Sequence, residues 1–247
     1  MKTYFDFAQG SPEYWAKRRG VPTASEASRI ITAVEGKPSK GGFGYACELV
    51  AQIYDPSYPR MDGFASSAMR NGQLMEGEAR AWLEMEIGQV RQVGFVTTDD
   101  GRFGCSPDAL IVSGDEIVGG VEIKSPDPKT HVAWLTEALN GPLLPDDHKQ
   151  QVHDCLAVTG LPYWIFASYV DGLPPFYVRV EPDAYTAKLK ESLESFWCVY
   201  QMVLARVREL GPEFKPAAVA DARAEEDAAL ACFGGTGPKD ANLMNES

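Results

Sequence analysis

The sequence predicts an α/β (α+β) domain with a central mixed β-sheet flanked by helices. Apolar residues recur at helical spacing in segments on both sides of the middle of the chain. From residue 89 the apolar period changes to that of strands, with turn residues between the runs, and two more strand-like runs follow later. We expect one domain over residues 1–212 and an acidic, flexible C-terminal tail at 213–247.

Two helices are predicted close to the N-terminus. The segment "SPEYWAKRRG" has Ser11 as N-cap and Gly20 just past the end of a short helix. The segment "TASEASRIITAV" begins a second helix, with Thr23 and Glu26 at the spacing of a capping box.

The turn between these helices brings basic residues close in sequence to a hydroxyl. Arg18 and Arg19 precede Ser25, which stands in the first turn of the second helix. A helix N-terminus with a hydroxyl and a nearby arginine can bind a phosphate. The alternative is an ordinary cap with solvated arginines, and from these residues alone it is the simpler interpretation.

A loop at "PSKGGFGY" and a helix at "YACELVAQIY" are expected next. The segment "GQLMEGEARAWLEMEIG" has a helical apolar repeat that leaves Glu76 and Arg80 on another face. Glu76 is either a solvated helix charge or an acid directed into a cleft, and the periodicity does not decide between them.

Three strands follow, at "QVRQVGFVTT", "FGCSPDALIV" and "IVGGVEIKSP", with turns at "DDGR" and "SGDE". The last two are most simply an antiparallel hairpin, in which Asp108 near the start of one strand can lie opposite Glu122 near the end of the other. The remaining elements are a helical patch at "HVAWLTEAL", a helix at "DDHKQQVHDCLAVTG", strands at "PYWIFASYV" and "PFYVRVE", and a long amphipathic helix from "DAYTAKL" to "ARVREL".

Composition excludes several classes of protein. No apolar run approaches the roughly 20 residues of a membrane helix, and the N-terminus lacks the apolar stretch of a signal peptide, so we expect a cytoplasmic protein. Five scattered cysteines without CxxC spacing argue against disulfides and a zinc site. A net charge of −12 argues against a protein that coats nucleic acid, but not against a nuclease with metal-binding carboxylates.

The stretch "GGVEIKSP" raises the question of function. On a strand, Glu122 and Lys124 point to one side, while Val121 and Ile123 point to the other. One interpretation is an edge strand with a solvated polar face and a weak surface ion pair. The other is a catalytic face, formed if Asp108, Glu122 and Lys124 converge.

Converging carboxylates repel one another, and a hard cation such as Mg²⁺ relieves this repulsion. In phosphodiester hydrolysis, two such ions roughly 3.5 to 4 Å apart stabilise the attacking and leaving oxygens. Lys124 would orient or help deprotonate the attacking water and offset the developing charge. The backbone carbonyl of Ile123, between Glu122 and Lys124, is a further possible ligand.

"SPD" followed by "EIK" is the signature of the PD-(D/E)XK nucleases, which have a restriction-endonuclease-like core. In order, "WAKRRGVPTASEA", "GQLMEGEAR", "CSPDAL", "VEIKSP" and "QQVHDCLAVTG" resemble the phage lambda exonuclease family of viral recombinases, also called alkaline exonucleases. These motifs span residues 15–160, and the later strands and long helix extend the resemblance to about residue 210.

This resemblance implies a role for individual residues. Asp108, Glu122 and Glu76 would bind Mg²⁺, or alternatively Mn²⁺, and Lys124 would be the catalytic lysine. Gln151 would contact the attacking water or Lys124. Arg18 and Ser25 would bind the 5′-phosphate of a DNA end, although the adjacent Arg19 leaves that assignment ambiguous by one residue. His153 stands where the lambda enzyme has Gln, and a hydrogen-bonded structural histidine is the simpler interpretation.

The resemblance also implies an activity and partners. The activity would be processive 5′ to 3′ digestion of one strand of linear duplex DNA, which leaves a 3′ single-stranded tail for recombination. Relatives form a homotrimeric ring around DNA and work with a single-strand annealing protein, in a phage or prophage setting in a bacterial cell. The alternatives are an endonuclease or repair nuclease of the same fold, and a catalytically inactive DNA-binding recombination protein.

Overall fold

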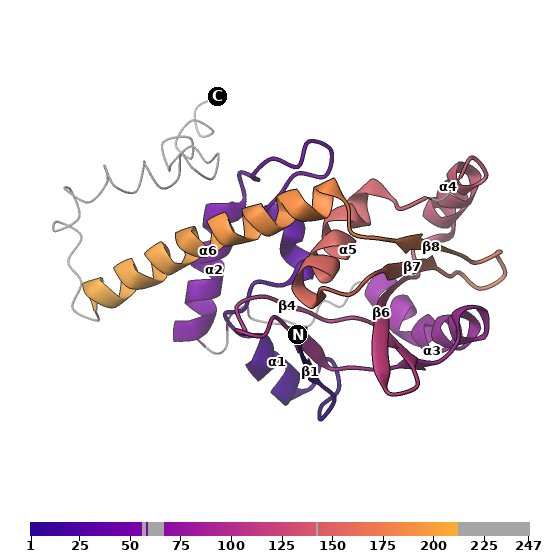
Figure 1. Cartoon of the computed structure of the whole chain (residues 1–247), viewed down its shortest axis with the longest axis horizontal. Helices are drawn as coiled ribbons and strands as arrows, with labels where there is room; N and C mark the ends of the chain where they lie inside the picture. Colours follow the sequence, from indigo (N-terminus) through magenta and orange to yellow (C-terminus); the bar gives the residue numbers. More distant parts are fainter. Residues whose placement is uncertain (56–57, 59–66, 142, 212–247) are drawn as a thin grey trace.

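The computed structural model of this chain describes residues 1–55, 58, 67–141 and 143–211, without the side chains of 67–74 and 76 (Figure 1). The predicted acidic tail lies outside the described residues, so the domain boundary at residue 212 stays a prediction. The helices are α1 (Pro12–Arg18), the 3₁₀ helix η1 (Ala24–Arg29), α2 (Gly42–Tyr54), α3 (Ser67–Ile87), α4 (Pro128–Ala138), α5 (Asp146–Thr159) and α6 (Ala184–Leu210).

The main sheet has five strands and is mixed, as predicted. Its order is β2 (Val90–Arg91), β5 (Ala109–Ser113), β6 (Glu116–Lys124), β7 (Trp164–Ser168) and β8 (Phe176–Val180). The β6 and β7 strands are parallel, and the other neighbours are antiparallel. A smaller sheet contains β1 (Lys2–Tyr4), β3 (Phe95–Thr97) and β4 (Gly104–Cys105).

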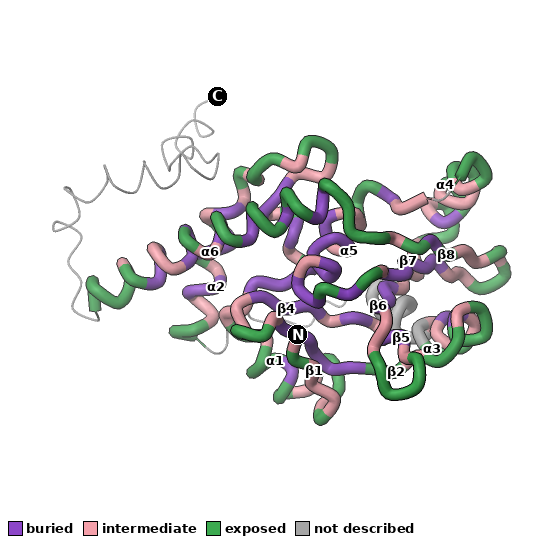
Figure 2. Tube along the Cα trace, viewed as in Figure 1, coloured by how far each residue is buried: buried purple, intermediate pink, exposed green. Residues whose placement is uncertain are grey.

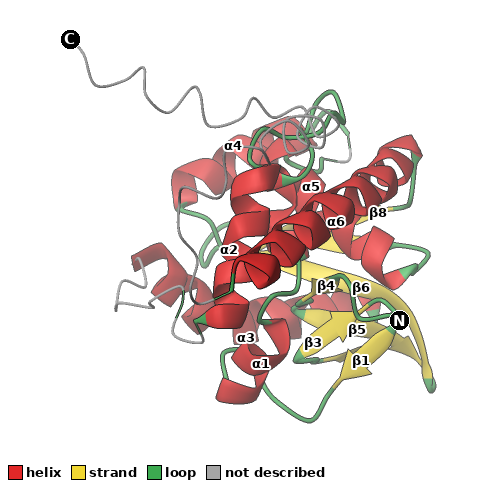
Figure 3. Ribbon diagram, turned by 90° about the vertical axis from the view of Figure 1, so that its left-hand side faces the viewer, coloured by secondary structure: helices red, strands yellow, loops and turns green. Residues whose placement is uncertain are grey.

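Helices cover both faces of the main sheet (Figure 3). On one face, Trp164 and Phe166 of β7 belong to the large core formed with α2, α5 and α6. On the other face, Val121 and Ile165 pack in a second cluster with Leu83 of α3. The α5 helix is largely buried between the sheet and α6 (Figure 2). This arrangement explains why consecutive residues of β6 meet different surroundings.

The predicted hairpin is confirmed, but the strands before it divide differently from the prediction. The run "QVRQVGFVTT" forms β2 and β3, which belong to different sheets. Gly94, between them, donates its N–H to the carbonyl of Tyr4, and a Cβ at this position would collide with the carbonyl of Phe7. The N-terminal segment therefore packs closely against Gly94 between the two strands, a contact that the apolar alternation did not indicate.

The run "FGCSPDALIV" also changes sheets. Its first part, β4, pairs with β3, and its second part, β5, pairs with β6. Ser106, Pro107 and Asp108 lie at the crossing between the two sheets. The crossing places neighbouring residues of one motif against two different parts of the molecule.

The first two predicted helices differ in type. The α1 helix has the predicted N-cap, since the Ser11 side chain accepts a hydrogen bond from the N–H of Tyr14. The second is a 3₁₀ helix, and Thr23 makes no side-chain cap. The Thr23 N–H donates to the Tyr45 hydroxyl, and Glu26 pairs with Arg29 instead of closing a capping box. A tertiary hydrogen bond of Thr23 and a local ion pair of Glu26 thus replace the predicted capping box.

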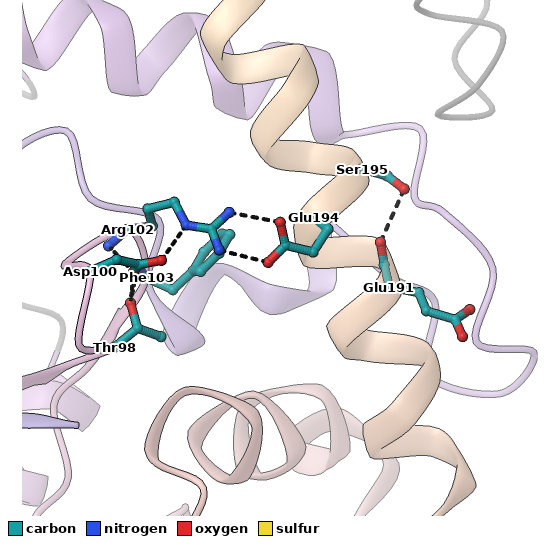
Figure 4. A network of polar contacts seen from close by, with 7 residues as sticks. All are labelled: Thr98, Asp100, Arg102, Phe103, Glu191, Glu194 and Ser195. Carbon is teal, nitrogen blue, oxygen red and sulfur yellow. Dashed lines mark hydrogen bonds and ion pairs between the residues drawn. The ribbon is translucent and has the colours of Figure 1, made fainter.

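The small sheet is fastened to α6 by Arg102, in the turn between β3 and β4 (Figure 4). The Arg102 guanidinium donates from its two terminal nitrogens to Glu194, at 2.7 and 2.9 Å, and from Nε to Asp100. It also lies over the rings of Phe103 and Trp197.

Within the described part of the chain, no helix is both long enough and apolar enough to cross a membrane.

Candidate active site

The charged pair of "GGVEIKSP" lies in the middle of the main sheet. The β6 strand has β5 on one side and β7 on the other, so the edge-strand interpretation is wrong. Glu122 is only 4% exposed, and its Oε1 lies 2.6 Å from Nζ of Lys124. The Nε2 of Gln151, on α5, donates to the same oxygen at 2.7 Å. The structure thus brings Glu122, Lys124 and Gln151 together.

Asp108 lies next to this group through the hairpin register. Ala109 pairs with Val121, so Asp108 lies opposite Glu122, as the sequence predicted. The Asp108 N–H donates to the carbonyl of Val121 at 3.0 Å, and its Oδ2 accepts from the N–H of Ile123 at 2.5 Å. Both backbone and side chain of Asp108 are therefore fixed to β6.

The charges of these residues act on Lys124. Burial lowers the pKa of Lys124, but the carboxylates of Glu122 and Asp108 outweigh this effect and raise its pKa above the ordinary value. Without a bound cation, Lys124 is therefore an ammonium that partly neutralises two carboxylates. Two carboxylates and one ammonium together carry one net negative charge.

The donor set fits a hard divalent cation. Asp108 and Glu122 offer carboxylate oxygens, and the carbonyl of Ile123 lies between Glu122 and Lys124 in sequence. The described residues contain no cluster of three or more His, Cys, Asp or Glu suited to a metal. The third predicted carboxylate, Glu76, belongs to α3, but its side chain lies outside the described residues. Its role stays a prediction.

Histidines near the site have structural partners. His148 lies stacked on Phe166, and burial, together with the Lys124 charge, lowers its pKa to about 4. The Nδ1 of His153 lies 2.8 Å from the Thr186 hydroxyl, which agrees with the expected structural histidine. The sequence did not predict that His148 would be held uncharged by its burial and by the charge of Lys124.

A second polar cluster contains Arg18 and Ser25. The Nη2 of Arg18 donates to the Ser25 hydroxyl at 2.6 Å, which confirms the predicted proximity. The Nη1 of Arg18 donates to the hydroxyl of Tyr14 at 2.8 Å and lies 3.4 Å from that of Ser106. Among the described residues, Arg18 has hydroxyl partners and no ion pair. A guanidinium held by neutral hydroxyls keeps its charge available for an anion.

Sequence reasoning missed Tyr14 and Ser106 as members of this cluster. Tyr14 precedes Arg18 by one helical turn, a spacing that could have indicated the contact. Ser106 arrives through the sheet crossing, which the sequence did not predict. Arg19 instead occupies the C-cap of α1 and is exposed, so the geometry favours Arg18 as the partner of Ser25.

Comparison with known proteins agrees with this geometry. Residues 13–162, more than half of the chain, match the model described as the YqaJ-like viral recombinase domain. The chain belongs to the YqaJ-like viral recombinase family. The matched range includes the Arg18 cluster and the residues Asp108, Glu122, Lys124 and Gln151. Comparison with curated protein sequences gave no match.

Solved structures give the same fold as this viral recombinase domain. An alkaline exonuclease from Laribacter hongkongensis, LHK-Exo, is 26% identical, with a TM-score of 0.67 over 82% of this chain and 99% of that chain. Its complex with dAMP is similar, at 25% identity, a TM-score of 0.68 and the same coverage. A phage-related exonuclease from Haemophilus somnus shares the fold at 11% identity, with a TM-score of 0.54 over 75% and 96% of the two chains. The predicted PD-(D/E)XK-type fold is thus confirmed.

Proposed function

We propose that this protein is a Mg²⁺-dependent exonuclease that digests the 5′-phosphorylated strand of linear duplex DNA in the 5′ to 3′ direction. The observation that carries the proposal is the convergence of Asp108, Glu122, Lys124 and Gln151 on the central strand β6. Family membership and the likeness to LHK-Exo support a nuclease of this kind. The product would be a duplex with a 3′ single-stranded tail.

The carboxylates would hold the metal. Asp108 and Glu122, with the Ile123 carbonyl and Glu76, would bind two Mg²⁺ ions, and Mn²⁺ is the alternative. When bound, the metal would supply charge stabilisation for the attacking and leaving oxygens of the phosphodiester. The hydrogen bond from the Ile123 N–H to Asp108 supports this role, because it fixes the carboxylate relative to Glu122.

Lys124 and Gln151 would act on the water and on Glu122. The raised pKa of Lys124, which its neighbouring carboxylates cause despite burial, favours an ammonium that orients the water and offsets charge on the phosphate. Gln151 donates to the same Glu122 oxygen that Lys124 contacts. Gln151 would therefore hold the carboxylate in place while Lys124 contacts the reacting groups.

The Arg18 cluster would recognise the DNA end. The guanidinium and the Ser25 hydroxyl can both donate to phosphate oxygens, because a hydroxyl rotates to suit its partner. Each hydrolysis that releases a 5′-mononucleotide leaves a new 5′-phosphate, so the same cluster would bind the end after every step. LHK-Exo has been crystallised with dAMP, a nucleoside monophosphate, which supports a mononucleotide product.

We also propose the family's assembly and partners for this chain. A homotrimeric ring around the DNA would let a chain of net charge −12 hold DNA by enclosure instead of by a basic surface. A single-strand annealing protein would coat the 3′ tail. A phage or prophage enzyme that acts on DNA in this way would work in the bacterial cytoplasm.

End selection separates this function from its alternatives. The test compares linear duplexes with 5′-phosphate or 5′-hydroxyl ends, and closed circular DNA, all in Mg²⁺. We expect the wild type to digest the 5′-phosphorylated strand fastest, and Arg18→Ala to lower this rate by about tenfold or more, since a charged hydrogen bond is lost. Arg19→Ala is the matched control and should stay within about twofold of wild type.

Two results would contradict the proposal. Cleavage of closed circular DNA, unaffected by Arg18→Ala, would favour an endonuclease or repair nuclease of the same fold. Binding of DNA without hydrolysis in Mg²⁺ or Mn²⁺ would favour an inactive recombination protein.

A further inference from the structure

We propose that Tyr14 is a positioning residue for recognition of the 5′-phosphate. Its hydroxyl would hold the Arg18 guanidinium in place and connect it to the segment that carries Asp108. This inference rests on the proposed function, because it concerns the same DNA end.

The Tyr14 hydroxyl lies between two members of the cluster. It accepts from the Nη1 of Arg18 at 2.8 Å and lies 3.0 Å from the Ser106 hydroxyl. Arg18 itself lies 3.4 Å from Ser106, at the outer limit of a hydrogen bond. Each of the two hydrogen bonds through Tyr14 is therefore shorter than the direct contact between Arg18 and Ser106.

The Tyr14 ring is fixed before any ligand binds. It is 5% exposed and lies edge-on against the buried ring of Phe95, with centroids 6.1 Å apart. Its backbone N–H donates to the N-cap Ser11. Arg18 is half-buried and has a long side chain with several rotatable bonds. A fixed acceptor therefore reduces the conformational freedom that the guanidinium would lose on binding phosphate.

The segment beyond Ser106 is also fixed. Ser106 stands two residues before Asp108, at the crossing between the small and main sheets. The Nε2 of Gln9 donates to the carbonyl of Pro107 at 2.7 Å and to that of Val93 at 3.1 Å. Tyr14 and Gln9 thus hold neighbouring points of the segment that ends at Asp108. These contacts set the position of the Arg18 cluster relative to Asp108.

The test is Tyr14→Phe, which keeps the buried ring and removes only the hydroxyl. Steady-state rates are measured in Mg²⁺ on linear duplexes with either 5′-phosphate or 5′-hydroxyl ends. We expect kcat/KM on the phosphorylated duplex to fall by about tenfold, mainly through a higher KM, because a hydrogen bond to a charged group is lost. The rate on the 5′-hydroxyl duplex should stay within about twofold of wild type.

The matched control is Tyr185→Phe. Tyr185 is also buried, and its hydroxyl donates to the carbonyl of Thr32 at 3.0 Å, so the substitution removes one tyrosine hydrogen bond outside both clusters. This variant should leave the preference for 5′-phosphate unchanged. Melting temperatures of both variants report any general loss of stability.

Each outcome has a distinct meaning. A wild type that does not prefer 5′-phosphate overturns the proposed end selection itself. A wild type with the preference, and a Tyr14→Phe variant that retains it in full, overturns the role of Tyr14 alone. Equal losses on both duplexes would mean that Tyr14 serves only the fold, which also overturns the inference.

Discussion

At the scale of single residues, the site depends on charges placed where a sheet is normally apolar. Glu122 is buried on a central strand, and burial of a carboxylate is costly unless it is paired and hydrogen-bonded. Lys124 and Gln151 supply these partners on one oxygen. The sequence predicted the common face of Glu122 and Lys124 from strand alternation alone. It did not predict the burial, which depends on neighbouring strands.

Substitution of Gln151 tests whether the orientation of Glu122 matters for hydrolysis. We expect Gln151→Ala to lower the single-turnover rate constant by about tenfold or more, because Glu122 loses the hydrogen bond from Nε2 of Gln151 and is less well fixed. The measurement is single-turnover hydrolysis of a 5′-phosphorylated duplex in Mg²⁺. Gln201→Ala on α6 serves as the control, and equal rates for the two variants would contradict the role of Gln151.

Asp154 makes stability depend on pH. It is fully buried on α5, its Oδ1 has no hydrogen-bond partner among the described residues, and burial raises its pKa to about 8. The unfolded carboxyl titrates near its usual pKa of about 3.9. The folded protein therefore binds more protons between these values, and this residue's contribution to stability falls as pH rises from about 4 to 8.

Asp154→Asn should remove this contribution to the pH dependence. The variant should gain stability relative to wild type as pH rises through this window, with no further gain above about pH 9. Urea unfolding at a series of pH values measures the difference. A difference between the two proteins that stays constant from pH 5 to 8 would contradict the assignment.

At the scale of elements, local signals predicted the hairpin, and long-range pairing decided the rest. The turn at "SGDE" and the alternation on either side were sufficient to predict β5 and β6. The register that places Asp108 opposite Glu122 also depends on a shift in the pairing between Ile111 and Val112, which the alternation does not indicate. The crossing at Ser106 depends on β4 pairing with β3, and β3 with β1 near the N-terminus. No local pattern contains that information, which is why Ser106 was missed.

The contact between the small sheet and α6 is a further long-range feature. Arg102 binds Glu194 through two nitrogens (Figure 4), but Glu194 is 61% exposed, which limits the energy of the pair. We expect Glu194→Ala to lower the free energy of unfolding by about 0.5 to 1 kcal/mol.

The control for this contact is Glu191→Ala, one turn earlier on the same helix. The hydrogen bond drawn at Glu191 uses its backbone carbonyl, which accepts from Ser195 and survives the substitution. Chemical denaturation of both variants measures the difference. If Glu191→Ala were as destabilising as Glu194→Ala, the loss would belong to the helix surface and not to Arg102.

At the scale of the whole molecule, the proposed function requires the two polar clusters to act together on one DNA end. The Arg18 cluster lies where α1 meets Ser106 at the sheet crossing. The first carboxylate of the other cluster, Asp108, follows Ser106 by two residues. The net charge of −12 argued only against a chain whose surface as a whole is basic enough to coat DNA. Resemblance between ordered motifs, and not composition, predicted the family and the candidate residues.

The most direct test of the central claim is digestion of a linear duplex that carries a 5′-phosphate on one strand and a 5′-hydroxyl on the other. Wild type, Lys124→Ala and Lys129→Ala are compared in Mg²⁺; Lys129 is exposed on α4 and serves as the control. We predict mononucleotides from the phosphorylated strand with wild type and Lys129→Ala, and none with Lys124→Ala. Undiminished digestion by Lys124→Ala, or digestion that starts from the 3′ ends, would contradict the account.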